Sequence, residues 1–286
     1  MAVFLAKTEN EGQRADVFLA SKVKELSRSS LSKLFDEDKV KINQTIIKPS
    51  HKIHTGDKVS LGFDLGSINK TPRIRMPVIY EDEDVVVLDK PAGVLTHSKG
   101  VFNPEATVAA FIKPRLIDLS GERAGIVHRL DRGTSGVIIC AKTARASKFL
   151  QKQFSTRKVK KTYIALVAGE LDPPEAIIDM PIERNPKKPQ TFRTGPNGKS
   201  AVTTYKTLKS RSGYGLIELT PKTGRTHQLR VHLKQLNHPI VGDDFYDGEP
   251  AERLYLHAQS LNIMLPNGKK MLIKSPLPEE FNKMLK

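Results

Sequence analysis

The stretch HRLDRGTSGVIICA, residues 128–141, places a turn directly before a buried strand. Asp131 and the Gly-Thr-Ser at 133–135 are typical of turns, because such side chains bond the nearby backbone and glycine adopts conformations closed to other residues. Residues 137–141 are apolar without interruption, which predicts a strand covered on both faces. Taken by itself, the pattern favours Asp131 as a capping residue of the turn and places the strand inside a sheet.

Strands and helices are mixed irregularly on both sides of this stretch. Apolar runs predict further strands at residues 85–88, 163–168, 202–208 and 216–220. Apolar residues at helical spacing predict helices at 107–112, 142–154 and 227–236. Because strand and helix do not alternate regularly, an α+β fold is favoured over a doubly wound parallel sheet.

The first sixty residues have the pattern of a compact unit of their own. Apolar residues between 17 and 23 recur at helical spacing, residues 40–43 alternate as a half-buried strand does, and Gly56-Asp57 marks a turn. Residues 64–77 lack periodicity and contain Gly, Asn and two Pro, which is typical of a linker. We therefore predict a small domain at 1–63, a linker at 64–77 and a large domain at 78–286.

The chain carries a large excess of positive charge. Its 286 residues include 47 Lys and Arg against 31 Asp and Glu, which gives a net charge of +16. Hydrophobic residues make up 38% of the chain, enough for a core, so the charge does not signal disorder. Such an excess favours a polyanionic partner, because Lys and Arg displace the counterions of phosphates. A generally basic surface without a specific partner is the alternative.

Two segments concentrate this charge. Residues 141–161 contain eight basic residues and no acidic one, and residues 184–199 contain five basic residues, again without an acid. Four basic residues of the first segment fall on one face of the predicted helix, namely Lys142, Arg145, Lys148 and Lys152. The second segment is rich in Pro and Gly, which predicts an extended loop. Since unrelieved like charges call for an external anion, both segments are predicted to bind a phosphate backbone.

Motifs for other chemistries are absent from the sequence. Gly198-Lys199-Ser200 resembles the end of a phosphate loop, but Arg193 occupies the position of the required upstream glycine. There is no dinucleotide-binding motif and no Gly-x-Ser-x-Gly elbow, and His227 and His232 point to different sides of a helix, so no metal site is predicted. No apolar run approaches the roughly 20 residues of a membrane helix. With a single cysteine and no secretory signal, a cytoplasmic protein is expected.

Three blocks occur in a fixed order, and the second of them lies within the opening stretch. The first runs from Tyr80 to Gly93, the second from His128 to Gly136, and the third from Thr223 to His232, followed by residues 238–243 and Tyr246. In these blocks the chain closely resembles the RluA/RluD-type family of pseudouridine synthases, from residue 78 to residue 286. The resemblance implies a catalytic domain built on a mixed, largely antiparallel β-sheet with flanking helices and loops.

Residues 14–61 resemble the alpha-L RNA-binding domain, similar to that of a ribosomal small-subunit protein, which many members carry at the N-terminus. Two positions depart from the usual pattern of that domain: Asp38 stands in place of a glycine, and Asn43-Gln44 in place of Asn-Gly. Asp tolerates a left-handed backbone better than most residues, so the turn before the strand is still expected. Arg28 and Lys33 are the candidate RNA contacts of this domain.

The reaction implied by the resemblance isomerises uridine to pseudouridine. It breaks the bond between carbon and nitrogen, turns the uracil and rejoins it through carbon 5, without a metal or other cofactor. A carboxylate must act as nucleophile, or as base toward the ribose, and the resemblance assigns this role to Asp131. A cation such as Arg129 or Arg132 would favour its charged form if it lay within reach.

The resemblance also implies two partners for this carboxylate. Tyr163 matches the aromatic residue of the family's active site, whose ring can stack on the displaced uracil. Arg230 matches the arginine that pairs with the catalytic Asp and keeps it ionised. Arg129 is the candidate that enters the RNA helix when the nucleotide flips, and a plain phosphate contact is the alternative. Arg225 and His227 either contact RNA or hold their own loop.

The predicted RNA-binding residues are Arg129, Arg132, Lys142, Arg145, Lys148, Lys152, Arg184, Arg193, Arg225, His227, Arg28 and Lys33. Ribosomal RNA of the large subunit is the favoured substrate, and transfer RNA is the alternative. A non-catalytic RNA-binding or ribosome-assembly protein on the same fold is the rival from another class. A monomer is expected.

Overall fold

The computed structural model describes residues 2–23, 26, 28–67, 74–98, 105–121 and 123–286, without the side chains of residues 28 and 29. Contacts divide the chain into two units, Met1–Arg73 with Ser98–Glu105, and Ile74–His97 with Ala106–Lys286. The domain limits expected from the sequence stay a prediction, and residues 68–73 of the predicted linker lie outside the described part.

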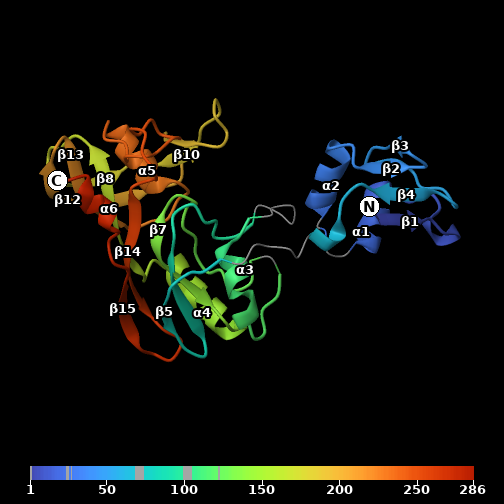
Figure 1. Cartoon of the computed structure of the whole chain (residues 1–286), viewed down its shortest axis with the longest axis horizontal. Helices are drawn as coiled ribbons and strands as arrows, with labels where there is room; N and C mark the ends of the chain where they lie inside the picture. The colour runs from blue at the N-terminus through green and yellow to red at the C-terminus, as the bar shows by residue number, and fades with distance from the viewer. Residues whose placement is uncertain (1, 24–25, 27, 68–73, 99–104, 122) are drawn as a thin grey trace. The chain divides into compact units, whose positions relative to one another are not determined.

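The first unit packs two helices against a four-stranded antiparallel sheet (Figure 1). The strand order is β1-β4-β2-β3. Its elements are β1 (Ala2–Leu5), η1 (Thr8–Asn10), α1 (Ala15–Lys22), α2 (Arg28–Asp36), β2 (Val40–Ile42), β3 (Thr45–Ile46), β4 (Lys58–Leu61) and η2 (Leu65–Ser67). Phe18 of α1 and Leu31 of α2 are fully buried in one core with Val59 of β4, so the helices and the sheet form a single packed body.

The turns of this unit use residues that accept a left-handed backbone. Asp38, before β2, has a φ of 56°, and Asn43 and Gln44, between β2 and β3, have φ values of 47° and 76°. Asp and Asn reach this region more readily than most residues other than glycine. The turn expected at Asp38 is therefore confirmed, whereas the identification of the unit as an alpha-L domain stays a prediction.

The second unit is built on a nine-stranded, largely antiparallel sheet in the order β5-β6-β7-β14-β8-β13-β12-β9, with β15 paired to β14 (Figure 1). The bounds are β5 (Val78–Glu81), β6 (Val85–Lys90), β7 (Ser135–Ala141), β8 (Lys160–Ala168), β9 (Glu175–Asp179), β12 (Val202–Arg211), β13 (Tyr214–Pro221), β14 (Leu256–Met264) and β15 (Lys270–Lys274). The predicted α+β class with a mixed sheet is confirmed, and β7 is buried at every position, as its apolar run predicted.

The helices described in this unit are α3 (Val108–Ile112), α4 (Ala144–Ser155), α5 (Gln228–Gln235) and α6 (Glu279–Lys283), with the short η3 (Lys113–Arg115) after α3. Thr143 begins α4 by accepting a hydrogen bond from the backbone N–H of Ala146, and Thr107 does the same for α3. Three of these helices match segments predicted from the spacing of apolar residues.

Residues 184–199 were expected to form an extended loop, and this prediction is wrong at Arg184 and at residues 192–194, which lie in strands, whereas residues 185–191 form a loop. β10 (Ile182–Arg184) and β11 (Phe192–Thr194) pair as an antiparallel hairpin. Ile182 and Phe192 pack with Val231 of α5, so apolar contacts to a distant helix order a segment whose composition is that of a loop.

β14 joins the two halves of the sheet. It pairs with β7 in parallel, with His257 opposite Ser135, and with β8 in antiparallel fashion, with Leu256 opposite Ala165. Gly136 has a φ of 107°, and a Cβ at this position would collide with the carbonyl of Ala258 on β14. A glycine is therefore required where β7 leaves the preceding turn and meets β14.

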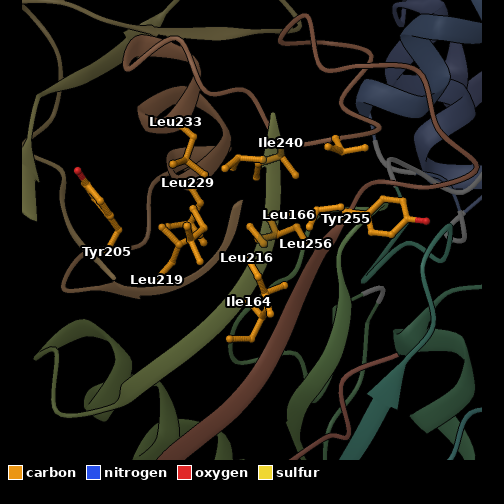
Figure 2. Packing of buried hydrophobic residues seen from close by; sticks show 14 of the residues in the cluster. Ile164, Leu166, Tyr205, Leu216, Leu219, Leu229, Leu233, Ile240, Tyr255 and Leu256 are labelled. Carbon is orange, nitrogen blue, oxygen red and sulfur yellow. The ribbon is translucent and has the colours of Figure 1, made fainter. Parts of the chain in front are cut away.

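In the half of the sheet that contains β8 and β13, the core lies between α5 and the sheet. Figure 2 shows Leu229 and Leu233 of α5 gathered with Leu166, Leu216 and Leu219 from β8 and β13. Burial of these side chains fixes α5 and the loop before it against the sheet. That loop carries residues 223–227, and the helix carries Arg230.

Candidate active site

A pocket of about 400 Å³ opens where the turn before β7 meets the loop before α5. Its volume is within the range of small-ligand pockets. Among the described residues that line it, Asp131 is the one carboxylate. The pocket is also lined by six cationic side chains, which are Arg129, Arg157, Lys161, Lys222, Arg225 and Arg230. It therefore combines one acidic group with a strongly positive wall.

The turn that carries Asp131 is held by hydrogen bonds to its backbone. The Thr96 hydroxyl donates to the carbonyl of Leu130 (2.8 Å) and accepts from its N–H (3.1 Å). The buried ammonium of Lys90 donates to the carbonyl of Arg132 (3.2 Å). The residues on both sides of Asp131 are thus fixed by distant parts of the chain, which limits the movement of its carboxylate.

The Asp131 carboxylate does not cap its own turn. The turn is closed by the N–H of Thr134, which donates to the backbone carbonyl of Asp131 at 3.1 Å. Oδ2 of the side chain lies 3.5 Å from Nη1 of Arg230 and 4.0 Å from Nε2 of His227. The capping role favoured by the local sequence is therefore filled by backbone atoms, and the carboxylate faces the pocket.

Arg230 is fixed by a second carboxylate. Its Nε and Nη2 donate to the two oxygens of Asp243 at 2.7 and 2.6 Å, while the guanidinium lies over the rings of Phe245 and Tyr246. Burial opposes the charge of Arg230, but the hydrogen bonds and charge of Asp243 outweigh it and raise the pKa of the guanidinium. Arg230 therefore presents a permanent, oriented positive charge to Asp131.

His227 is the second group that faces Asp131. It begins α5 with a φ of 56°, in the left-handed region that non-glycine residues rarely adopt. Its Nδ1 lies 2.8 Å from the hydroxyl of Tyr246, which itself accepts from the N–H of Phe192 at 3.0 Å. Burial lowers the pKa of His227, so the ring is neutral near pH 7. Strain of this kind is tolerated where a side chain must be aimed at a site.

Tyr163 lines the pocket from β8, opposite Ala258 of β14. Burial, and in second place the charge of Asp131, raise the pKa of its hydroxyl, which is therefore protonated at physiological pH. The ring offers an apolar face to a planar ligand, and the hydroxyl can donate a hydrogen bond.

His128, two residues before Leu130, has a structural position. Its Nε2 accepts a hydrogen bond from the N–H of Ile139 at 3.0 Å, and its ring stacks on Phe154 at 4.5 Å between centroids. Burial, followed by the charge of Lys161, lowers the pKa of His128 to about 3. The neutral ring thus fastens the start of the turn to β7.

Replacing His128 with Gln is expected to weaken the acid sensitivity of the fold. The folded state keeps His128 neutral down to about pH 3, whereas the unfolded chain binds a proton near pH 6.5. Stability contributed by the neutral ring is therefore present above pH 6.5 and lost as the pH falls towards 3, roughly 3 kcal/mol by pH 4. Urea unfolding of the wild type and of His128→Gln at pH 7 and pH 4 measures this loss. An equal loss of stability in the two proteins would refute the role of His128. His51→Gln, at an exposed position of the first unit, is the control.

The pocket brings together six of the residues singled out from the sequence. They are Asp131, Tyr163, Arg230, Arg129, Arg225 and His227. Arg225 also holds its own loop, because its Nε donates to the carbonyl of Ser200 at 3.0 Å. The pairing expected between Arg230 and Asp131 is present, although Asp243 is the closer partner of the guanidinium.

The other predicted RNA-binding residues lie outside the pocket lining. Arg132 donates to the carbonyl of Gly93 at 3.1 Å, and Arg184 to that of Pro189 at 2.7 Å. Lys148 and Lys152 are exposed on α4. In the first unit, Lys33 lies 3.7 Å from Glu37, and the side chain of Arg28 lies outside the described part.

Three of these cations have acidic partners that the local sequence does not show. Lys142 pairs with Glu81 at 3.0 Å, Arg145 with Asp84 at 2.6 Å and Arg193 with Glu183 at 2.7 Å. The premise that the charges of residues 142–161 and 184–199 lack acidic relief is therefore wrong for these positions. The acids come from β5, the loop after it, and β10, which the fold places beside the basic segments.

Sequence reasoning did not single out four residues of the site. Arg157, Lys161 and Lys222 line the pocket, and Asp243 holds Arg230. Asp243 stands in a block quoted from the sequence, but a lone Asp after Gly242 carries no signal of its partner. Arg157 and Lys161 were counted in the basic segment without a sign that they face the same pocket as Asp131.

Within the described residues, no group of three or more His, Cys, Asp and Glu side chains is arranged to hold a metal ion. In the same part of the chain, no helix has the length and apolar character required to cross a membrane.

Comparison with known proteins gives a consistent result. The profile of the family described as RNA pseudouridylate synthase matches residues 84–235. The chain is 33% identical to ribosomal large subunit pseudouridine synthase D of Haemophilus influenzae, over 97% of this chain and 91% of that protein. It is 37% identical to the protein of the same name from Borreliella burgdorferi, over 94% of this chain and 87% of that one.

Solved structures agree with the sequence comparison. Human RNA pseudouridylate synthase domain containing 1 matches with a TM-score of 0.61 and 26% identity, over 74% of this chain and 89% of that chain. Human RNA pseudouridylate synthase domain containing 4 matches with a TM-score of 0.58 and 28% identity, over 73% and 91% respectively.

Proposed function

The chain belongs to the RNA pseudouridylate synthase family, whose members are isomerases acting on RNA, and we propose that it converts uridines of large-subunit ribosomal RNA to pseudouridine with Asp131 as the reacting carboxylate. The observation that carries the chemical part is the position of Asp131, the one acid among the described residues that line a pocket with six cations. Such a pocket attracts a polyanion while it keeps one nucleophilic or basic group free to react.

Asp131 acts either as nucleophile at the ribose or as the base that deprotonates it. Both roles need a carboxylate held in a defined position, and the fixed guanidinium of Arg230 lies 3.5 Å from its Oδ2. A 3.5 Å contact does not consume the carboxylate, because the strong bidentate hydrogen bonds of Arg230 go to Asp243. We therefore assign Arg230 the task of holding the charge and position of Asp131.

Tyr163 and Arg129 are proposed to receive the flipped nucleotide. A base within a duplex is out of reach of a carboxylate in a pocket, so the target must leave its stack. Tyr163 offers a ring for stacking inside the pocket, and Arg129, which lines the pocket and is exposed to solvent, can fill the gap left in the RNA. His227 and Arg225 complete the wall on the side of α5.

Large-subunit ribosomal RNA is proposed as the substrate because relatives named for it match nearly the whole chain, the first unit included. We propose that the first unit contributes to RNA binding as an alpha-L domain, through Lys33 and Arg28. The remaining basic residues outside the pocket would add phosphate contacts, least of all Lys142, Arg145 and Arg193, whose charges are paired. The site of action would be the cytoplasm, where ribosomal RNA is assembled.

Mapping pseudouridines in cells that lack the gene tests this proposal. Loss of specific pseudouridines in large-subunit ribosomal RNA, restored by the wild-type gene and not by the Asp131→Asn gene, is the expected result. Loss confined to transfer RNA would replace the substrate but keep the chemistry. An unchanged pseudouridine pattern in every RNA, with purified protein that binds RNA without modifying it, would favour a non-catalytic RNA-binding protein.

A further inference from the structure

Arg157 has a backbone conformation that is normally reserved for glycine. It follows the end of α4 with a φ of 60°. Its N–H donates to the carbonyl of Phe154, and the N–H of Lys158 donates to that of Gln153. These two bonds define the Schellman motif, in which the left-handed residue is usually glycine because a Cβ is strained there. An arginine at this position therefore costs stability that a glycine would not.

The position of the Arg157 side chain offers a functional reason for the left-handed backbone. Arg157 is exposed and lines the pocket that contains Asp131. No ion pair to an acidic side chain is formed by Arg157 within the part of the chain that the structure describes. Local strain that persists without an internal contact to justify it is a feature of binding sites.

Lys161 lies on the same wall of the pocket, four residues further along the chain. Lys161 and Tyr163 are two residues apart in β8, so their side chains lie on the same face of the strand. Both line the pocket. Its Nζ donates to the carbonyl of Thr223 at 3.2 Å, which leaves donors for a ligand because an ammonium has three. Among the described residues, no carboxylate pairs with it. Burial lowers the pKa of the Lys161 ammonium to about 8, and no acidic neighbour in the described part of the chain offsets this effect of burial.

The other cations of the pocket are engaged differently. Arg230 is bound by Asp243, and Arg225 donates to the backbone of Ser200. Among the described residues, Arg230 is thus the one pocket cation in an ion pair, whereas Arg157 and Lys161 have none and share the short segment that runs from α4 into β8. A binding position for a phosphate needs cationic donors that point into the same space. Their hydrogen bonds must not all be taken up by groups of the protein itself.

We propose that Arg157 and Lys161 form a subsite for a backbone phosphate of the RNA next to the nucleotide held over Asp131. The subsite would fix the register of the strand, since phosphate contacts position an RNA chain without reading its sequence. This inference rests on the proposed function only in so far as the pocket receives RNA. It applies equally to ribosomal and to transfer RNA.

The variant Arg157→Gly separates binding from folding. Glycine removes the charge and the strain together, so the unfolding midpoint should stay equal or rise. RNA affinity should fall, and the slope of log Kobs against log salt should become shallower by about 0.7–0.9, the value for one lost phosphate contact. Lys161→Met should show a similar loss of slope, and the double variant the sum of the two.

Two matched controls accompany this experiment. Ser212 has a φ of 55° in the turn between β12 and β13 and is not part of the pocket, so Ser212→Gly relieves the same kind of strain elsewhere. Lys209 is exposed on β12, away from the pocket lining, so Lys209→Ala removes one charge from the surface. Both controls should retain the RNA affinity and the salt slope of the wild type.

A neutral linkage in the RNA locates the contact. A series of short substrate RNAs, each with one methylphosphonate in place of a phosphate, should contain one position at which wild-type affinity falls clearly. At that position, Arg157→Gly and Lys161→Met should lose little further affinity, because the partner of the cation is already absent. At other positions, each variant should lose as much affinity as it does with unmodified RNA.

A second measurement uses the titration of Lys161. The affinity of the wild type for RNA should fall as the pH rises from 7 to 9, because a neutral amine no longer attracts a phosphate. Lys161→Met should show a smaller fall over the same range. The comparison isolates Lys161 from the other titratable groups that line the pocket, which are Asp131, His128, Tyr163, His227 and Lys222.

An unchanged salt slope in both Arg157→Gly and Lys161→Met, with both proteins folded, would overturn the subsite. So would a methylphosphonate series in which the variants respond like the wild type at every position. The RNA is chosen by activity: whichever RNA the wild type modifies is used for binding. Failure to modify large-subunit ribosomal RNA would therefore revise the proposed substrate and leave the subsite to be tested on the RNA that is modified.

Discussion

Replacing Asp131 with Asn is expected to lower the rate of pseudouridine formation by at least about 10³-fold, which corresponds to roughly 4 kcal/mol in the activation free energy. Asn has the shape of Asp but can act neither as a nucleophile nor as a base at this position. RNA affinity should stay equal or increase, because the one acid among the described residues of the pocket lining is removed. Tritium release from RNA labelled at carbon 5 of uracil measures the rate, and filter binding measures the affinity.

The opposite directions of these two effects make the result specific. A misfolded variant would lose both activity and affinity, so retained binding shows that the pocket is intact. Asp118→Asn removes a carboxylate that accepts from the N–H of Ala144 at the start of α4, outside the pocket, and should leave the rate of the folded enzyme unchanged. Full activity of Asp131→Asn would remove Asp131 from the reaction.

Replacing Asp243 with Asn is expected to reduce both stability and activity. Arg230 is 7% exposed and would keep its charge after losing the two short hydrogen bonds to a carboxylate. Breaking a buried ion pair from one side costs up to about 3–5 kcal/mol, and the lower part of this range is expected because Asp131 at 3.5 Å still offsets some of the charge. The released guanidinium would then bind Asp131 more closely, so the rate should fall by about 10²-fold even at temperatures where the variant is folded. Urea unfolding and single-turnover rates measure the two effects.

The neighbouring Asp244 provides the matched control for this substitution. It is exposed and directly follows Asp243 in the chain, so Asp244→Asn should change neither stability nor rate. The double variant Asp243→Asn with Arg230→Met adds a sharper test. Removing the stranded charge should recover part of the lost stability, but not the activity, because Asp131 then lacks its cation. Recovery of the rate in the double variant would contradict the role assigned to Arg230.

The sequence was sufficient to predict those features that depend on neighbours along the chain. The apolar run before Ala141 predicted β7, and the spacing of apolar residues predicted α4 and α5 to within two residues. The three blocks, taken in order, indicated the family and the pocket residues Asp131 and Arg230, and the resemblance added Tyr163. The roles of these residues came from the family resemblance, because the local pattern alone favoured a capping role for Asp131.

Features that depend on tertiary contacts could not be predicted. The partners Asp243 of Arg230 and Glu81 of Lys142 lie 13 and 61 residues away in sequence, and no local pattern links them. The hairpin of β10 and β11 was also missed, because its order comes from Ile182 packing on α5 and not from its Pro- and Gly-rich composition. Likewise, the sequence shows Arg157 as one basic residue among eight, whereas its left-handed backbone is visible only in the structure.

The central position of β14 has a consequence for the folding of the enzyme during its synthesis. Asp131 belongs to the half of the sheet that contains β6 and β7, while Tyr163, His227 and Arg230 belong to the half built from β8, β13 and α5. These halves are joined through residues 256–264, about 120 positions after β7 in the order of synthesis. In the nascent chain, Asp131 and Arg230 therefore come together only after β14 has been synthesised and has paired with β7 and β8. Contacts of such large sequence separation form slowly, so the pocket is completed only after residues 256–264 have been synthesised.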